Sequence, residues 1–277
     1  MGHYQPRNER NLSMARIYTV ANNKGGCGKT ATAVNLAAAL RLRGFDALCI
    51  DLDAQANLTA CLRVEVTAGR TMFDALKQRG AAYISPVRVL NPEGRTVGAL
   101  DVLPATRDLS AVEVGLAQER DRLTRVRTYV DRYRDAYDVI LIDTPPALGL
   151  LTISALYAAD GVIMAVQPQY LAVQGLLSLR ETVANLNANG AAILTERVLF
   201  TQYDGRKGLH RLTVEQVAAA GVPMFNTIIR DNVALGEAPA TGTDIFTYNR
   251  RSRGAADYAA LADELIATDK LKHYKHQ

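Results

Sequence analysis

The chain has 277 residues, of which 48% are apolar, so it can bury the core of one large α/β domain or of two small ones. Its net charge of +4, with a pI near 9.0, permits contact with nucleic acid or acidic lipid but requires neither. Three cysteines without metal-ligand spacing and four scattered histidines argue against a disulfide framework, a histidine metal site and a Ser-His-Asp triad, and they favour a reducing cytoplasm.

Residues 1–14 are polar and charged, so we expect a flexible N-terminal arm there and no signal peptide. Beyond them, a helical pattern from Lys29 to about Arg43 and further helical patterns alternate with the apolar runs RIYTVA (16–21), FDALCID (45–51), YDVILID (137–143), GVIMAV (161–166) and RVLFTQ (197–202). From Val64 to Leu100 the pattern is less regular, and we expect short helices and an extra strand laid over the core. The alternation predicts a single α/β domain over residues 15–277, with a mostly parallel twisted sheet and helices on both faces.

A glycine-rich segment, NNKGGCGKT, joins the first predicted strand to the first predicted helix. Glycines in such a turn let backbone N–H groups converge on an anion at a helix N-terminus. Lys29 would then reach the β- and γ-phosphates of a nucleotide, and the Thr30 hydroxyl would bind Mg²⁺. The segment departs from the usual phosphate loop because Asn23 stands where a glycine is expected and Lys24 adds a second lysine. We expect the nucleotide to be bound by Lys24, Gly25, Gly26, Cys27, Gly28, Lys29, Thr30 and Ala31.

Carboxylates end two of the predicted strands. In DLDAQANLT, Asp51 and Asp53 point to the same side because strand side chains alternate, so both can face a bound phosphate. Asp143 ends YDVILID, where a carboxylate can hold Mg²⁺ through water. Ligands of parallel sheets bind beyond the carboxyl ends of the strands. The sequence therefore predicts a metal site formed by Thr30, Asp53 and Asp143, with Asp51 as an outer-shell or structural group.

The blocks KGGCGKT, DLDAQANLT and VILIDTPPALGLLTISAL resemble the ParA/MinD family of deviant P-loop ATPases. The later blocks VQPQYLAVQGL, TQYDGR, NVALGEAP and RRSRGAADYAALADEL are closer to the partition branch, so the resemblance runs from Arg16 to about Ile266. It implies a P-loop NTPase fold, ATP and Mg²⁺ as cofactors, and weak intrinsic ATPase activity. No guanine-reading Asn-Lys-x-Asp motif is present, which favours ATP over GTP. The adenine is expected near the loops at Gln202 and Arg230.

The same resemblance assigns roles to individual residues. Lys24 would reach across a dimer interface to the phosphates of the partner's ATP, which offsets the repulsion between two facing nucleotides. Asp53 would orient or activate the attacking water, so Lys24, Lys29 and Asp53 are the expected catalytic residues. Asp143, followed by Thr144-Pro145-Pro146, would form a switch that senses the γ-phosphate.

Basic residues concentrate late in the chain. The resemblance to the partition branch implies sequence-independent DNA binding by the ATP dimer, with contacts from Arg206, Lys207, Arg211, Arg250, Arg251 and Arg253. If three such residues per subunit touch phosphates, the slope of log affinity against log salt is about −3 for a monomer and nearer −5 for a dimer. The sequence departs from the family at residues 229–234, where IRDNVA stands in place of Ile-Pro-Arg-Asn-Val-Arg, and at Gln169, which replaces a glutamate.

Partners also follow from the resemblance: homodimerisation on ATP binding, a ParB-like centromere-binding adaptor that stimulates hydrolysis, and a cytoplasmic, nucleoid-associated location. A ParA-like ATPase that positions a protein or organelle cargo stays open as an alternative, since the sequence does not separate the two. A MinD-like membrane-surface regulator would need an amphipathic C-terminal helix, and the tail DKLKHYKHQ offers only Leu271 and Tyr274.

No stable membrane association is expected. The longest apolar stretch, around Leu148 to Val166, is interrupted by Asp160 and Gly161, whereas a membrane span needs roughly 20 uninterrupted apolar residues.

A third class of function is that of a metabolic enzyme that uses the same phosphate-binding loop, such as an amidoligase or a reductase ATPase. The reductase type needs cysteines for an iron–sulfur cluster, and the absence of cysteine after Cys61 argues against it.

Overall fold

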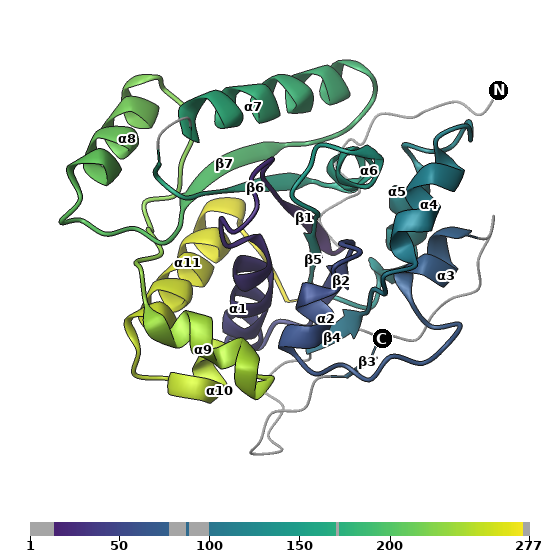
Figure 1. Cartoon of the computed structure of the whole chain (residues 1–277), viewed down its shortest axis with the longest axis horizontal. Coiled ribbons are helices and arrows are strands. Elements are labelled where there is room, and N and C mark those ends of the chain that lie inside the picture. The colour runs from purple at the N-terminus through teal and green to yellow at the C-terminus, as the bar shows by residue number, and fades with distance from the viewer. Residues whose placement is uncertain (1–13, 78–86, 89–99, 170–171, 274–277) are drawn as a thin grey trace.

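The apolar runs of the sequence form strands of one sheet in the computed structural model of the chain, which describes residues 14–77, 87–88, 100–169 and 172–273 (Figure 1). Within these residues the sheet has seven strands in the order β3-β4-β2-β5-β1-β6-β7, and only the pair β3 and β4 is antiparallel. The strands are β1 (Arg16–Ala21), β2 (Ala47–Asp51), β3 (Val87–Arg88), β4 (Leu100–Leu103), β5 (Val139–Asp143), β6 (Gly161–Val166) and β7 (Thr195–Phe200).

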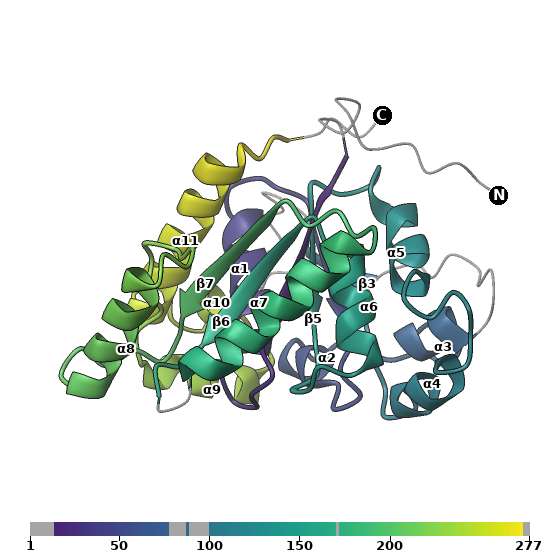
Figure 2. The same cartoon turned by 90° about the horizontal axis from the view of Figure 1, so that it is seen from above.

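Helices cover both faces of this sheet, as the sequence predicts (Figures 1 and 2). One face packs against α1 and α11, and the other packs against α3 to α8, which explains why β2, β5 and β6 are buried along their whole length. The helices are α1 (Lys29–Arg41), α2 (Asn57–Cys61), α3 (Met72–Lys77), α4 (Leu109–Leu116), α5 (Arg125–Val130), the 3₁₀ turn η2 (Asp131–Tyr133), α6 (Leu150–Ala158), α7 (Ala172–Ala188), α8 (Gly208–Ala219), α9 (Val233–Thr241), α10 (Ile245–Asn249) and α11 (Arg253–Asp269). The prediction of an α/β fold is confirmed.

Element ends differ from the sequence-based prediction by a few residues. Helix α1 ends at Arg41 because the chain turns at Gly44, whose φ of 87° lies in the left-handed region. The expected extra strand is β3, and it extends the edge of the sheet instead of lying over the core. Residues 78–86 and 89–99 of the same region, and residues 1–13 of the predicted arm, lie outside the described residues. No described helix has the length and apolar character that crossing a membrane requires.

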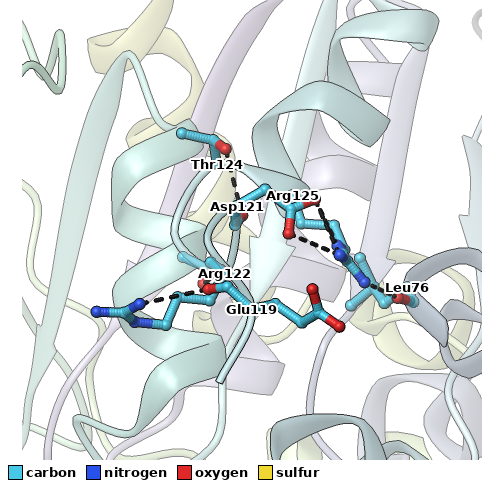
Figure 3. Close-up of polar contacts among 7 residues, drawn as sticks. Leu76, Glu119, Asp121, Arg122, Thr124 and Arg125 are labelled. Atoms are coloured by element: carbon cyan, nitrogen blue, oxygen red, sulfur yellow. Dashed lines mark hydrogen bonds and ion pairs between the residues drawn. The ribbon is translucent and has the colours of Figure 1, made fainter. Parts of the chain in front are cut away.

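A hydrogen-bond network joins α3 to the turn between α4 and α5 (Figure 3). The Arg125 guanidinium donates to both carboxylate oxygens of Asp121, at 2.6 Å and 3.1 Å, and to the Leu76 carbonyl at 3.1 Å. The Arg122 guanidinium donates to the Glu119 carbonyl in the same turn. Since α5 packs against α6, this network fixes the helices that cover the β2–β4 side of the sheet.

A buried ion pair lies at the end of the sheet where the parallel strands begin. The Arg134 guanidinium donates to Asp160 at 2.8 Å and 3.2 Å and to the Ala15 carbonyl at 2.8 Å. The same Asp160 carboxylate accepts the backbone N–H of Ile17 at 2.9 Å. Both charged side chains are nearly inaccessible to water, at 6% and 7% exposure. The pair therefore ties the starts of β1 and β6 to the turn before β5.

Replacing Asp160 by alanine should lower the free energy of unfolding by about 3–5 kcal/mol, because it removes the buried counter-charge of Arg134 and leaves this guanidinium with only the partly exposed carboxylate of Asp131, at 2.6 Å. Equilibrium unfolding in urea, followed by circular dichroism, measures the change. Arg180→Ala is the control, because its pair with Glu196 is partly exposed and should contribute less than about 1 kcal/mol. An Asp160→Ala effect as small as that of the control would contradict a structural role for the buried pair.

Candidate functional site

A glycine-rich loop, residues 22–28, connects the end of β1 to the start of α1. Gly26 and Gly28 have φ values of 70° and 83°, a left-handed conformation that side chains other than glycine rarely adopt. Gly28 precedes α1, and no side chain of the described residues caps the N-terminus of this helix. The first N–H groups of this helix are therefore available to an anion, and the helix dipole favours one there.

Lys29, the first residue of α1, folds back over this loop. Its Nζ donates to the Lys24 carbonyl at 3.0 Å, and the residue as a whole is only 7% exposed. The Cys27 thiol lies beneath the loop, donates to the same Lys24 carbonyl at 3.2 Å, and has a pKa raised by burial. The charge of Lys29 is thus held against the inner side of the loop, where an anion at the helix N-terminus would lie.

Two carboxylates meet at the carboxyl edge of the sheet because Asp51 of β2 and Asp143 of β5 stand opposite each other in the parallel register. Burial, followed by the charge of Asp51, raises the pKa of Asp143 to about 8. Burial also raises the pKa of Asp51 to about 6. Thr30 donates from its hydroxyl to Asp143 at 2.6 Å, which links α1 to β5. A cation beside Asp143 would relieve this accumulation of negative charge.

Asp51 and Asp53 have different surroundings. The Asp51 carboxylate accepts the N–H and the hydroxyl of Thr59 at 2.9 Å and 2.7 Å and the N–H of Asp53 at 3.2 Å, so all its contacts are internal. Asp53 accepts the N–H of Gln55 at 2.9 Å and lines the cavity described below. Thr59 binds Asp51, which does not line the cavity, so Asp51 suits the structural role expected for it, and of the two carboxylates Asp53 is the one that faces the cavity.

The cavity beside the loop has a volume of about 380 Å³. Its polar wall contains Asp53 and Thr144, together with seven of the residues predicted to bind a nucleotide, namely Gly25, Gly26, Gly28, Lys29, Thr30, Ala31 and Gln202. Its apolar wall comes from α1, α2 and α9 and includes Val34, Cys61, Leu235, Ala238 and Pro239. The sequence does not predict this apolar wall; the block NVALGEAP, which forms most of α9, is the signal in the sequence that corresponds to it. An apolar surface next to an anion site suits a nucleotide, which has a base at one end and phosphates at the other.

The cavity also fits Mg²⁺. Within the described residues, no group of three or more His, Cys, Asp or Glu side chains is arranged to hold a metal ion. Mg²⁺ does not need such a group, because it commonly keeps several waters and binds one or two carboxylates together with phosphate oxygens. Thr30 and Asp53 line the cavity and offer oxygen ligands of this kind. Asp143 does not line the cavity: it is fully buried, and its carboxylate accepts from the Thr30 hydroxyl at 2.6 Å, so it would act on Mg²⁺ through Thr30 or water.

Arg230, the second residue expected beside the adenine, does not line this cavity. The Asp257 carboxylate of α11 binds it, accepting from the Arg230 backbone N–H at 2.9 Å and from its guanidinium at 2.5 Å and 3.0 Å. Gln202 does line the cavity, and its amide Nε2 donates to the Gly26 carbonyl at 2.7 Å. Of the two residues predicted near the base, the fold brings only Gln202 to the site.

Lys24 is exposed on the outer side of the loop, and its side chain lies away from the cavity that Lys29 lines. It lines a second hollow of about 480 Å³ together with Asn23, Gln167 and Gly175. Its Nζ donates to the side-chain carbonyl of Gln169. The two lysines of one loop therefore occupy different environments, one inside the cavity and the other on the surface.

The predicted DNA-contacting residues form two exposed groups on different helices. Arg206 and Lys207 precede α8 and Arg211 lies in its first turn, whereas Arg250 and Arg251 lie between α10 and α11. Arg253 begins α11. In Figure 1, α8 lies at the upper left and α10 at the lower left, so the two groups are separate on this side of the molecule.

Comparisons with known proteins show which family the chain resembles. Residues 15–195 match the family described as an AAA domain. The chain is 39% identical to the chromosome-partitioning ATPase Soj of Treponema pallidum over 258 residues, covering 92% of this chain and 99% of that protein. It is 34% identical to the chromosome partitioning protein ParA of Caulobacter vibrioides over 265 residues, covering 94% and 97%.

Among solved structures, a similar one is cobyrinic acid a,c-diamide synthase from Mycobacterium smegmatis with a bound ATP analogue and magnesium. The TM-score is 0.78 at 29% identity, and the match covers 92% of this chain and 96% of that one. Together with the glycine loop, its second lysine and the paired strand-end carboxylates, these matches show that the chain belongs to the ParA/MinD family of P-loop ATPases, as a Soj-like member.

Proposed function

We propose that this chain is a ParA-type partition ATPase. In this proposal ATP drives the formation of a sandwich dimer, the dimer binds DNA without sequence preference, and hydrolysis stimulated by a ParB-like adaptor releases it. The observation that carries the proposal is the different placement of the two loop lysines. Lys29 is buried beside the cavity of its own subunit, whereas Lys24 is exposed, its Nζ is bonded to the neutral side chain of Gln169, and it can reach a second subunit.

The first part of the cycle is binding of ATP with Mg²⁺. The loop N–H groups and Lys29 would hold the phosphates, and Thr30, Asp143 and Asp53 would hold Mg²⁺ directly or through water. Bound Mg²⁺ would neutralise charge on the phosphate oxygens. Asp53 is the residue that would orient the attacking water, because its carboxylate lines the cavity and is only partly used by Gln55.

The second part is dimerisation. Two nucleotides that face each other repel strongly at short range, and a positive charge donated by each subunit to the other offsets this repulsion. Lys24 is suited to this because its charge is not buried against a carboxylate and its partner, Gln169, is neutral. Contact with the γ-phosphate would make the dimer depend on ATP, since ADP lacks that group.

The third part is binding to DNA and to the adaptor. Six exposed basic residues per subunit, Arg206, Lys207, Arg211, Arg250, Arg251 and Arg253, supply the positive charge, and a dimer doubles their number on one particle. Such a protein would be cytoplasmic and associated with the nucleoid. An ATPase that rides on DNA but moves a protein or organelle cargo would use the same surfaces.

The structural likeness to cobyrinic acid a,c-diamide synthase supports a second candidate, an enzyme that uses ATP to form an amide. Such an enzyme requires a carboxylate substrate for turnover, whereas a partition ATPase hydrolyses ATP alone and responds to DNA and adaptor. The Soj and ParA relatives are more similar to this chain, at 39% and 34% identity, and favour the partition function.

The two loop lysines should separate nucleotide binding from dimerisation. Lys29→Ala should weaken ATP binding roughly 10- to 150-fold, because a hydrogen bond to a charged group contributes about 1.5–3 kcal/mol. Lys24→Ala should bind ATP as the wild type does and remain monomeric. Titration with a fluorescent ATP analogue measures the binding, and sedimentation velocity with and without ATP measures the dimer. ATP-induced dimers of Lys24→Ala would rule out the role in the partner's site.

Asp53→Ala should form the ATP dimer but hydrolyse ATP roughly 100-fold more slowly or worse, since a positioned acid–base group contributes about 10²–10⁴-fold. Phosphate release under single-turnover conditions measures this rate. Asp46→Ala is the control, because Asp46 lies outside the cavity lining. A normal hydrolysis rate in Asp53→Ala would remove the proposed role of Asp53 in positioning water.

Wild-type protein should bind a labelled DNA duplex of arbitrary sequence tightly with ATP and Mg²⁺ and weakly with ADP. Raising the salt from about 50 to 200 mM should lower the affinity of the ATP state about a thousand-fold if a dimer makes six phosphate contacts. Fluorescence anisotropy measures both effects. If the protein bound DNA neither with ATP nor with ADP, the proposed function as a DNA-binding partition ATPase would be contradicted. ATP-dependent binding to anionic liposomes would then favour the membrane-surface alternative.

A further inference from the structure

We propose that residues 201–207, here called the coupling segment, transmit the state of the nucleotide loop to the basic residues in front of α8, and that Gln202 is the positioning residue for this coupling. The inference rests on the proposed function, because it requires a nucleotide at the loop and DNA at the basic residues. It adds a specific physical connection between the two.

One end of the coupling segment is bonded to the nucleotide loop. The Thr201 hydroxyl donates to the Cys27 carbonyl at 2.7 Å, and the Gln202 amide donates to the Gly26 carbonyl at 2.7 Å. Thr201 is 2% exposed, so its bond is shielded from water. Gln202 and Gly26 also line the cavity, so a bound nucleotide would lie against both partners of the second bond. Occupation of the cavity can therefore change this bond directly.

The backbone of Gln202 makes the segment sensitive to that bond. Its φ of 51° lies in the left-handed region, which residues other than glycine adopt at a cost. The amide bond to Gly26 offsets this cost. When the bond is lost or redirected, the backbone would gain by leaving the left-handed conformation, so this one contact would decide between the arrangement seen here and a relaxed one.

The other end of the segment holds Arg206. The Asp204 carboxylate accepts the Arg206 backbone N–H at 3.0 Å and its guanidinium through two bonds of 2.9 Å. The backbone N–H of Asp204 donates to His210 of α8 at 3.1 Å. Arg206 itself is 91% exposed. Gln202 lies two residues before Asp204, so a change in its backbone would move Asp204 and with it Arg206. It would also change the strength of the Arg206–Asp204 ion pair, which competes with DNA phosphates for the Arg206 guanidinium.

The segment is also paired with the chain around Arg230. The Tyr203 N–H donates to the Ile229 carbonyl at 3.1 Å, and the Asp231 N–H donates to the Tyr203 carbonyl at 2.9 Å. These two bonds make residues 229–231 follow the coupling segment when it moves. The effect of the nucleotide would thus reach charged residues on two loops instead of one.

The test compares DNA binding at saturating nucleotide in wild type, Gln202→Gly and Gln202→Asn. Glycine adopts the left-handed backbone without an amide side chain, and asparagine tolerates that backbone but is one methylene shorter. Both variants remove the bond to Gly26, so one folded variant is enough for the test. Thermal melting verifies that a variant is folded. Gln216→Ala, on the exposed side of α8, is the matched control.

We expect the ratio of DNA affinities with a non-hydrolysable ATP analogue and with ADP to fall at least tenfold in both Gln202 variants and to stay unchanged in Gln216→Ala. Anisotropy of a labelled duplex measures the ratio. A wild-type ratio in the Gln202 variants would overturn the coupling and leave the proposed function intact. The variants could instead bind nucleotide more weakly but show the wild-type ratio of DNA affinities once the nucleotide is saturating. That result would assign Gln202 to nucleotide binding alone, and it would also overturn the coupling.

A wild-type protein without nucleotide-dependent DNA binding would instead overturn the proposed function itself. The two failures are distinguishable, because the first is read from the variants relative to the wild type and the second from the wild type alone.

Discussion

The parallel register of β1, β5 and β2 is the constraint on which the site depends. It sets Asp143 beside Val20 on one strand and Asp51 on the other, so the carboxylates and the start of the glycine loop lie at one edge of the sheet. A shift of one residue in β5 would turn the Asp143 side chain to the opposite face and remove its bond to Thr30. The buried pair of Arg134 and Asp160 at the other edge helps to hold β1 in place beside β5 and β6, because it ties the starts of β1 and β6 to the turn before β5.

This arrangement concentrates negative charge in a buried place, and the chemistry of the site follows from that. Asp51 is satisfied by Thr59, whereas Asp143 is left with Thr30 as its side-chain partner and has a raised pKa. Lys29 lies close enough to lower the pKa of Asp143, but this only partly compensates for burial and for Asp51. A divalent cation would offset this negative charge and that of a phosphate chain, and Mg²⁺ with a nucleotide is what a P-loop ATPase binds.

The glycine loop is a junction of three sets of contacts. Its inner side forms the cavity, its outer side presents Lys24 next to Gln169, and its carbonyl groups accept bonds from Thr201 and Gln202. In the proposed cycle, the nucleotide, the partner subunit and the DNA-binding residues would thereby all be connected to one short backbone segment. A loop built from glycines suits this role, because its carbonyl and N–H groups can point in different directions without clashes between side chains.

Local pattern in the sequence determined the parallel α/β class, the glycine loop before a helix, the strand-end positions of Asp53 and Asp143 and the unusual lysine at position 24. These features depend on residues close together in the chain, where periodicity and turn chemistry act. Only the tertiary structure decided that α9 supplies the apolar wall of the cavity and that the Gln202 amide bonds to the Gly26 carbonyl. It also decided that Thr59 is hydrogen-bonded to Asp51 and that Arg230 is hydrogen-bonded to Asp257. Most of these contacts join residues far apart in the chain, such as Gly26 and Gln202, and they exist because packing of the helices on the sheet brings distant loops to one edge.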